Sequence, residues 1–365
     1  MSAERIIAIH MHPNADAIEL ADVLGWRVVV KKDEFKVGEL VLYYRIDAIL
    51  PQENPDYAFL GGKALKTKKI RGELSQGLCG PLAWASWHGV DPATLSAGAE
   101  GRDLTAEFSR DGKLGKREDD EGGNEGGASS ILPFGVPKTR EARVQDCPRI
   151  IREMVGKPVV MTRKEDGTSF TVIHCQGETA LCSRTQHLEA VRGGLQDASD
   201  LSSHDKNVAH YLAIEHELGL RAKLAATGLD LALQGEVCGP KINGNRMKLD
   251  KLIFRAYKVW DIKQRAYWSR KRTELFLAPM GIEMVPIVWR GIFTAERASV
   301  AALLAEAEQV HYDGQEDILG EGFVCMTDSD DGVLHHSFKV ISNEYLLAHD
   351  APHAKKKKQQ PSSTK

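Results

Sequence analysis

The stretch from Thr105 to Val136 most constrains how this chain of 365 residues can fold. It contains EFSRDGKLGKREDDEGGNEGGASSILPFG, which is charged, rich in glycine and poor in apolar residues. Such a sequence buries too little apolar surface to offset the conformational entropy that ordering costs. We therefore expect a flexible linker over 106–139, between an N-terminal domain (1–105) and a second domain (140–350), each long enough to bury a core.

The rest of the composition is typical of a soluble protein. The formal net charge is −3, so the whole-chain charge neither demands nor excludes a nucleic-acid partner. The six cysteines include no Cys-x-x-Cys pair, which argues against zinc ribbons and a disulfide framework. No apolar run approaches the roughly 18 residues that span a bilayer, so we expect no membrane partner and an intracellular location, cytoplasmic or nuclear. Residues 351–365 include four consecutive lysines and predict a basic disordered tail.

Residues 1–105 contain short apolar runs that predict β-strands. The runs are rich in valine, isoleucine and aromatic residues and are separated by turn formers: RIIAIHMHP, WRVVVKKDE, ELVLYYRIDAIL and LCGPLAWAS. Between the first two runs, ADAIELADVLG predicts a short helix that ends at Gly25. Such a pattern suits a small closed barrel such as an OB-fold, or another small β domain.

Residues 140–350 show a mixed pattern of strands and helices. Amphipathic helices are predicted over 206–227 and 295–310, where apolar residues recur at helical spacing. Five strands are predicted among them, at Val159–Met161, Phe170–His174, Leu231–Val237, Phe254–Ile262 and Gly322–Met326.

One lysine lies just before an Asp-Gly pair, in TRKEDGTSF at 162–170. Asp-Gly between two extended runs is first of all a hairpin-turn signal, so Lys164 is either a surface lysine at a turn or a nucleophile. Lys-x-Asp-Gly alone is weak evidence, since roughly one chain in ten of this length contains it by chance. Further short motifs follow in order: CSRT (182–185), LQGEVCGP (233–240), YKVWDIK (257–263), EGFV (321–324) and SFKVISNEYLL (337–347). No P-loop or dinucleotide-binding glycine turn is present.

In this order and spacing, the motifs resemble those of the covalent nucleotidyltransferase superfamily, which comprises ATP-dependent DNA and RNA ligases and mRNA capping enzymes. The resemblance is closest to the fifth family of ATP-dependent RNA ligases. NADAIELADVLGW and KTKKIRGELSQGLCGPL also resemble the OB domain of that family. The resemblance implies a multidomain fold, with an N-terminal β-barrel (OB-fold) and an α+β nucleotidyltransferase domain, ATP-grasp-like, with antiparallel sheets.

The resemblance also implies the chemistry. Lys164 would attack the α-phosphate of ATP, release pyrophosphate and become lysyl-AMP, with Lys339 contacting the same phosphate. A free lysine has a pKa of about 10.4, so only about one in a thousand is an amine at neutral pH. Cationic neighbours and a divalent metal would help it lose its proton, and the candidates are Lys339, Arg184 and Mg²⁺.

Acids and arginines of the other motifs would hold the cofactors. By the resemblance, Mg²⁺ or Mn²⁺ is held by three acids, often through its waters: Asp166, Glu236 and Glu321. ATP would contact a second set of residues: Arg143, Arg184, Glu236, which is our candidate for the ribose, and Lys339. The adenine would pack on Val259 or Trp260, and alternation along a strand puts only one of them in the pocket.

Two residues depart from the family pattern. The residue before the nucleophile is often glutamate in RNA ligases and is Arg163 here, which could alter how the adenine is held. The last motif often contains Lys-x-Lys, whereas this chain has Ser337-Phe338-Lys339, which lacks one cation and could slow adenylylation. Because the nucleophile and the three acids are retained, we expect an active enzyme.

The stretch KALKTKKIRG at 63–72 is the densest basic segment of the predicted domains. Lysines on an edge strand also prevent aggregation, which is the simpler explanation. On an OB domain attached to a ligase, contact with nucleic-acid phosphates is at least as plausible, and the residues concerned are Lys66, Lys68, Lys69 and Arg71.

The sequence therefore predicts a monomeric ATP-dependent RNA ligase that joins 3′-OH and 5′-phosphate ends, at nicks in a duplex, through lysyl-AMP and an RNA-adenylate. A DNA ligase or a GTP-dependent capping enzyme is the nearest alternative, although both usually carry an OB domain after the last motif. A non-catalytic RNA-binding protein with a decayed ligase domain is the alternative from another class, and Arg163 and Ser337 are the features that favour it.

Overall fold

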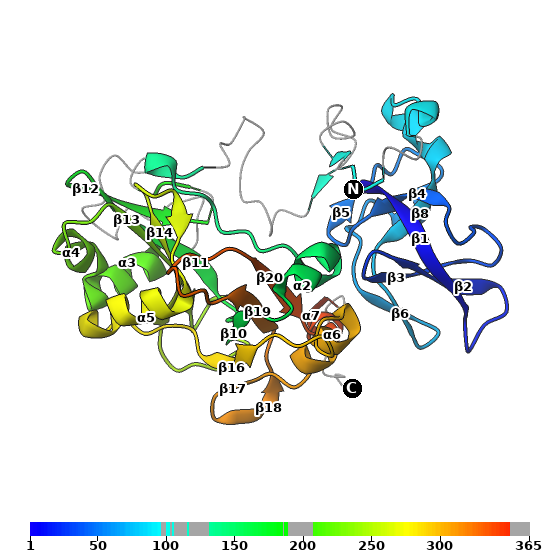
Figure 1. The fold of residues 1–365 in the computed structure, drawn as a ribbon. Coiled ribbons are helices and arrows are strands. Elements are labelled where there is room, and N and C mark those ends of the chain that lie inside the picture. Colours follow the sequence, from blue (N-terminus) through cyan, green and yellow to red (C-terminus); the bar gives the residue numbers. More distant parts are fainter. Residues whose placement is uncertain are drawn as a thin grey trace, which may run out of the picture.

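The computed structural model describes residues 1–95, 100–102, 104–105, 115–116, 131–184, 186–188 and 207–350, and it shows two domains beside each other (Figure 1). Most of the predicted linker (106–139) and the lysine tail (351–365) lie outside the described residues. No helix in the described ranges is long and apolar enough to cross a membrane.

The N-terminal domain is built on one antiparallel sheet. Its strands lie in the order β3 (Trp26–Lys31), β2 (Ile18–Val23), β1 (Ser2–Met11), β4 (Leu40–Tyr44) and β8 (Leu78–Pro81). Alternate side chains of β4 enter different apolar clusters, since Val41 and Tyr43 belong to one and Leu42 and Tyr44 to the other. Two short pairs complete the domain: β5 (Ala48–Ile49) with β9 (Gly115–Lys116), and β6 (Lys68–Ile70) with β7 (Glu73–Ser75). The predicted OB-type β domain is confirmed.

The helix predicted over 15–25 is wrong, because this segment contains β2. The strand pairs with β1 on one side and β3 on the other, and its register with β3 runs from Ile18 opposite Lys31 to Val23 opposite Trp26. A two-residue turn therefore joins β2 and β3. The helical spacing of the apolar residues was outweighed by pairing with two neighbouring strands, which no local pattern reveals.

Gly25, in that turn, permits a close approach between the domains. Its N–H donates a hydrogen bond of 3.0 Å to the carbonyl of Gln145 in the second domain. A Cβ atom at this position would lie 2.8 Å from the Cα atom of Gln145 and 2.9 Å from a methyl group of Val300. Any side chain here would push the domains apart, so the glycine serves the domain contact rather than a helix end.

The second domain contains two antiparallel sheets. The first has the order β16 (Ile287–Ile292), β10 (Pro158–Arg163), β19 (Gly322–Thr327) and β20 (Ser337–Ile341). The second has the order β12 (Glu178–Ser183), β11 (Thr168–Cys175), β13 (Leu231–Cys238), β14 (Ile253–Asp261) and β15 (Ala266–Tyr267). A separate hairpin joins β17 (His311–Tyr312) to β18 (Gln315–Leu319). The predicted strands are therefore present, and the antiparallel α+β domain is confirmed.

Helices cover one face of each sheet. The first sheet packs on α2 (Pro148–Met154) and α6 (Val300–Ala307), and the second on α3 (Val208–Leu218), α4 (Leu220–Ala225) and α5 (Arg270–Leu277). The helix predicted over 206–227 is broken, because Gly219 adopts a left-handed conformation with φ of 59° and separates α3 from α4. The helix predicted over 295–310 is shorter and begins after its cap, Ser299.

Side-chain contacts join the domains. The indole Nε1 of Trp26 and the guanidinium Nε of Arg45 both donate to the Oδ1 atom of Asp146, at 2.9 and 3.1 Å. A second contact involves α7 (Asn343–Asp350), whose Asn343 and Glu344 accept from Gln76 and Lys69 of the N-terminal domain, both at 3.1 Å.

Candidate active site

Lys164 lies where the two sheets of the second domain meet. The segment 164–167 leaves β10 in the first sheet and enters β11 in the second, so the hairpin turn suggested by Asp-Gly is wrong. The N–H of Lys164 donates a 2.9 Å hydrogen bond to the carbonyl of Gly322. Gly167 passes so close to β13 that a Cβ atom would lie 2.6 Å from the Cys238 sulfur, which accounts for the glycine.

The ammonium group of Lys164 is held by acids. Its Nζ atom lies 2.7 Å from an Oε2 atom of Glu321, and the side chain is 27% exposed. Burial alone would lower the pKa of Lys164, but the carboxylates of Glu321, Glu236 and Asp166 outweigh it and hold the pKa above its ordinary value. Before nucleotide and metal bind, the lysine is therefore a protonated ion-pair partner.

The surroundings of Glu236 strongly raise the pKa of its carboxyl. Burial raises its pKa, Lys164 opposes that shift, and Glu321 and Asp166 add to it, so the pKa reaches about 8. With a pKa of about 8, the Glu236 carboxyl is mostly protonated at neutral pH, and a divalent cation bound beside it would favour its ionised form. Within the described ranges, no three acidic, histidine or cysteine side chains already converge as a metal-binding group. Carboxylate oxygens are ligands of Mg²⁺, which usually keeps several of its waters and also binds phosphate oxygens.

Asp166 has several partners of its own. Its Oδ1 atom accepts a 2.9 Å hydrogen bond from the amide of Asn243. Its Oδ2 atom accepts from Arg246 at 3.0 Å and from the hydroxyl of Tyr345 at 2.5 Å. Asp166 thus fastens the loop after β13 and the start of α7 to the segment that carries the lysine.

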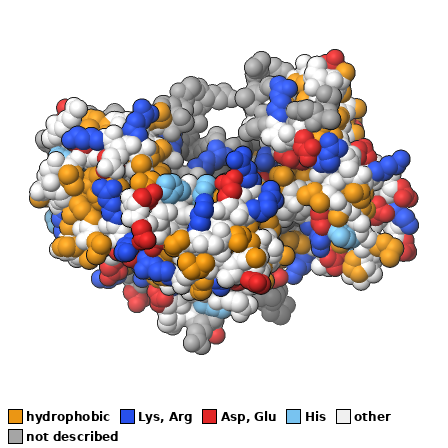
Figure 2. All heavy atoms as spheres, in the orientation of Figure 1, with side chains coloured by type: hydrophobic (Ala, Val, Ile, Leu, Met, Phe, Trp, Pro, Cys, Tyr) orange, Lys and Arg blue, Asp and Glu red, His pale blue; other side chains and the backbone are white. Residues whose placement is uncertain are grey.

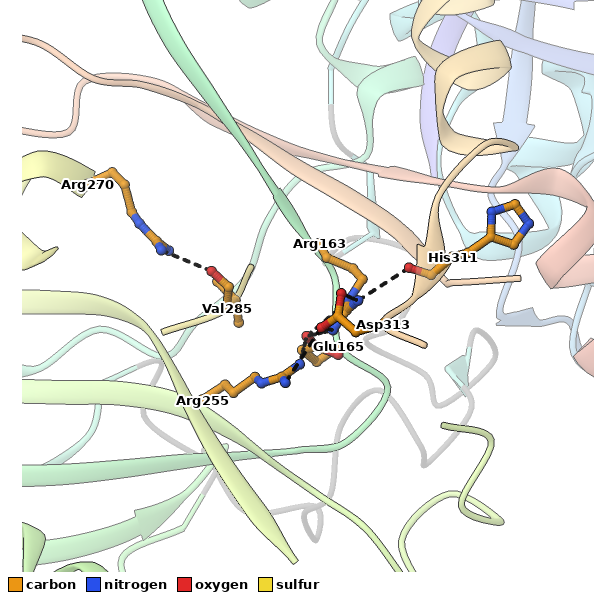
Figure 3. A network of polar contacts seen from close by, with 7 residues as sticks. All are labelled: Arg163, Glu165, Arg255, Arg270, Val285, His311 and Asp313. Atoms are coloured by element: carbon orange, nitrogen blue, oxygen red, sulfur yellow. Dashed lines mark hydrogen bonds and ion pairs between the residues drawn. The ribbon is translucent and has the colours of Figure 1, made fainter. Parts of the chain in front are cut away.

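The side chains on either side of Lys164 point into a separate buried ion network (Figure 3). The Oε1 atom of Glu165 accepts from Arg163 Nε at 3.1 Å, from Arg163 Nη2 at 2.9 Å and from Arg255 Nη1 at 2.7 Å. Asp313, in the turn between β17 and β18, also binds Arg163, at 2.7 Å. Arg163 therefore tethers the lysine segment to this hairpin.

A strap formed by residues 137–146 runs along both sheets before it reaches the N-terminal domain. The carbonyl of Pro137 accepts from Gln234 of β13, and the Thr139 hydroxyl lies 3.1 Å from the hydroxyl of Tyr257. Further along, Ala142 accepts from the backbone N–H of Lys339 at 2.8 Å. Arg143 follows and lies 3.9 Å from Asp47 of the N-terminal domain. Arg143 and Lys339 are thus brought together at the domain boundary.

Lys258 joins the strap to the last motif. Its ammonium forms an ion pair with Glu141 and lies 3.4 Å from the hydroxyl of Ser337, which itself donates to Glu141 at 2.6 Å. The attraction of Lys258 and hydrogen bonds from Lys258 and Ser337 outweigh burial and lower the pKa of Glu141. The side chain of Lys258 is therefore part of the site, although it lies on a strand of the other sheet.

The remaining predicted nucleotide contacts lie on different faces. Val259 is completely buried in the helix-covered core, so it faces away from the site. Trp260 is opposite Ala232 in the register of β13 and β14, on the face that carries Glu236. Arg184 follows β12 and lies close enough to Glu236 to influence its pKa. Of the two adenine candidates, the fold leaves Trp260 on the appropriate face.

The predicted basic segment forms the hairpin of β6 and β7. Lys68, Lys69 and Arg71 are exposed, and Lys66 is half-buried. Lys69 forms the ion pair with Glu344 of α7, so this hairpin lies against the second domain. On the face shown in Figure 2, lysine and arginine side chains gather in the region between the two domains.

Sequence reasoning missed several residues of the site. Lys258, Arg246 and Asn243 make contacts with predicted site residues. Lys258 lies within the motif YKVWDIK, and its charge in a mostly apolar strand was an available signal. Asn243 and Arg246 lie in a loop with no motif, so only the folded chain could reveal them.

Comparisons with known proteins support this geometry. A family model described as an OB-fold domain matches residues 1–82, and one described as RNA ligase matches residues 157–341, just over half of the chain. The phenylalanine–tRNA ligase beta subunit of Syntrophus aciditrophicus is 38% identical over 78 residues, which are 20% of this chain. This chain spans only 9% of the length of that protein.

Solved structures match nearly the whole chain. Naegleria gruberi RNA ligase with PPi has a TM-score of 0.78 and 26% identity, covering 96% of this chain and 98% of that one. A mutant of the same ligase with AMP and Mn has a TM-score of 0.78 and 25% identity, covering 96% of this chain and 99% of that one. Another mutant, with ATP and Mn, has a TM-score of 0.77 and 25% identity, covering 96% of this chain and 98% of that one. Together with the family match and the lysine between two sheets, these similarities establish that the chain belongs to the RNA ligase family.

Proposed function

We propose that this protein joins RNA 3′-OH and 5′-phosphate ends at nicks in a duplex, using ATP and Mg²⁺ or Mn²⁺. The observation that carries the proposal is the ion pair of Lys164 with Glu321 beside Glu236 and Asp166, at the junction of two sheets. Naegleria gruberi RNA ligase, which is similar over both domains, has been solved with ATP and Mn. Phosphoryl transfer needs positioned groups and compensating charge, and this cluster supplies both.

Lys164 is the nucleophile of the first step. Its ammonium loses a proton, for which Glu321 is the acceptor at 2.7 Å, and the free amine attacks the α-phosphate. The new N–P bond gives lysyl-AMP as the bond to the β-phosphate oxygen breaks and pyrophosphate leaves. A bound divalent cation, held by Asp166, Glu236 and Glu321 directly or through water, would supply charge compensation for the carboxylates and phosphates.

Other residues position the nucleotide. We propose that Arg184 and Lys339 contact the α-phosphate and that Glu236 also binds the ribose. Trp260 forms the adenine wall, which its place on the Glu236 face supports. Arg143 contacts the phosphates, and its buried Nη1 atom, which lacks a hydrogen-bond partner in the described part of the chain, is consistent with an anionic ligand.

Two later steps complete the reaction. The RNA 5′-phosphate attacks lysyl-AMP, forms an RNA-adenylate and releases the Lys164 amine. The 3′-OH then attacks the 5′-phosphate, a phosphodiester forms, and AMP leaves. The exposed basic hairpin of the N-terminal domain binds phosphates of the duplex through Lys66, Lys68, Lys69 and Arg71.

Several broader features belong to the same proposal. The domain division is 1–105, 106–139 and 140–350, followed by the basic tail at 351–365. The described residues of the predicted linker that follow Ile131 pack on the second sheet, since Leu132 and Val136 share a cluster with Ile173. We further propose that the protein acts as a monomer in the cytoplasm or nucleus.

The decisive experiment is adduct formation with labelled nucleotide. The wild type should form an acid-stable adduct from ATP with Mg²⁺ or Mn²⁺, and the Lys164→Ala variant should form none. Label from GTP but not ATP would indicate a capping enzyme, and equal sealing of all-DNA nicks would indicate a DNA ligase. The absence of any adduct with the wild type would leave a non-catalytic RNA-binding protein.

A further inference from the structure

The loop between β13 and β14, residues 239–252, is rich in basic residues and is here named the basic loop. It contains Lys241, Arg246, Lys248 and Lys251, with Asp250 as its only acid. The basic residues were not singled out by any sequence motif. The loop lies beside the nucleophile, because Asn243 donates both to Asp166 at 2.9 Å and to the carbonyl of Gly167 at 2.7 Å.

The basic loop has a fixed shape. Four of its non-glycine residues, including Lys241 and Lys248, adopt positive φ angles, which a loop holds only where its surroundings support them. Met247 is buried against Cys238 and Tyr312, so the loop is anchored on an apolar underside. The polar bonds of Asn243 and this apolar contact fasten the loop from two directions.

Three lysines project from this fixed frame. Lys241, Lys248 and Lys251 are exposed, and none of them forms an ion pair with a side chain in the described ranges. Two exposed lysines elsewhere in the same domain are paired instead, Lys263 with Asp230 and Lys271 with Asp330. The three lysines therefore present positive charge that no side chain in the described part of the chain neutralises through an ion pair.

The basic loop is also linked to the basic hairpin of the N-terminal domain. Arg246 donates to the hydroxyl of Tyr345 at 3.2 Å, and its guanidinium lies over the Tyr345 ring. The preceding residue, Glu344, pairs with Lys69 of that hairpin. The first turn of α7 thus lies between two basic segments, one from each domain, and the same Tyr345 contacts Asp166 beside the nucleophile.

We propose that the basic loop binds RNA phosphates and, with the basic hairpin, forms one RNA-binding surface that leads to Lys164. The ligand class follows from the charge, because separate exposed lysines suit the spaced phosphates of a strand better than one buried triphosphate. The lysines contact phosphates rather than bases, so binding is independent of sequence. This inference rests on the proposed function, which supplies RNA as the substrate.

The test is a variant in which Lys241, Lys248 and Lys251 are all changed to alanine. Each phosphate contact contributes roughly 0.7 to 0.9 to the slope of log affinity against log salt, so the slope should fall by about 2. Affinity for a nicked RNA duplex near 0.1 M salt should fall on the order of tenfold or more. Sealing of a pre-adenylated nick at limiting RNA should fall in parallel, while formation of lysyl-AMP from ATP stays at the wild-type rate.

A matched control removes three other exposed lysines of the same domain, Lys157, Lys263 and Lys271. This variant has the same net charge, so it should keep the wild-type affinity if position matters. Wild-type affinity and salt slope in the basic-loop variant would overturn the inference, and so would an equal loss in the control. A loss of lysyl-AMP formation would instead place the loop in the nucleotide site. Failure of the wild type to form lysyl-AMP would contradict the proposed function itself. That result differs from a failure of the basic-loop inference, in which the wild type still forms lysyl-AMP.

Discussion

The ion network beside Lys164 allows one prediction to be worked out quantitatively. The Glu165 carboxylate is completely buried and accepts from Arg163 and Arg255, whereas Asp313 is 66% exposed. In Glu165→Gln the shape is retained but the charge is lost, which leaves two guanidinium groups with only the solvated Asp313. Breaking a buried pair in this way costs about 3–5 kcal/mol, and the similar shape of glutamine favours the lower end.

Two effects should follow from that cost. A loss of about 3 kcal/mol in a domain of this size lowers the melting temperature by roughly 6–12 °C. Because Arg163 and Glu165 flank Lys164, the backbone that carries the nucleophile should also shift. A misplacement of about 1 Å can cost on the order of a hundredfold in rate, so lysyl-AMP formation should fall by about that factor.

The assay compares two steps of the reaction at a temperature where Glu165→Gln remains folded. Single-turnover formation of lysyl-AMP uses Lys164 as the nucleophile, whereas sealing of a pre-adenylated nick does not. The first rate should fall about a hundredfold and the second less than about tenfold. An equal fall in both rates would show general damage to the fold, and a wild-type rate of adenylylation would refute the positioning role.

A second buried arginine provides the control. Arg270, also drawn in Figure 3, donates to the carbonyl of Val285 and pairs with Glu274 on the same helix. Glu274→Gln likewise removes a carboxylate from a buried arginine, but away from the nucleophile. It should lower thermal stability but leave the ratio of the rate of lysyl-AMP formation to the rate of nick sealing unchanged.

Three further predictions concern other parts of the molecule. Lys164→Ala should abolish the adduct with labelled ATP but retain measurable sealing of a pre-adenylated nick. Gly25→Ala places a Cβ atom 2.8 Å from the Cα atom of Gln145 and should loosen the domain contact, detected as faster limited proteolysis between the domains. In Lys258→Met, the free energy of unfolding should depend less on pH in the acid range than it does in the wild type. Because the pKa of Glu141 is lowered in the folded state, the stability from this pair is present above the ordinary glutamate pKa and lost as pH falls through the lower value. Acid unfolding followed by fluorescence checks this.

The sequence was most informative where the chemistry lies within short segments. Lys164, Glu236 and Glu321 lie together, as their motifs predicted. The two adenine candidates were left open by the sequence, and the register of β13 and β14 separates them, because Val259 faces the helices and Trp260 the opposite side. Motifs identify residue types, but only strand pairing decides which side chains share a face.

The errors have a common physical cause. Residues 15–25 have helical spacing but form β2, because two neighbouring strands pair with them. Asp166-Gly167 resembles a hairpin turn, but β10 and β11 pair with strands distant in sequence and belong to different sheets. In both cases, long-range pairing determined the structure and the local pattern carried no trace of it.

The two departures from the family pattern also change meaning once the chain is folded. Arg163 replaces an expected acid, yet Glu165 and Asp313 balance its charge. Ser337 replaces an expected cation, and the ammonium of Lys258, which is paired with Glu141, lies 3.4 Å from its hydroxyl. The two departures therefore do not count against an active ligase, because Arg163 has acidic partners and Lys258 lies beside Ser337.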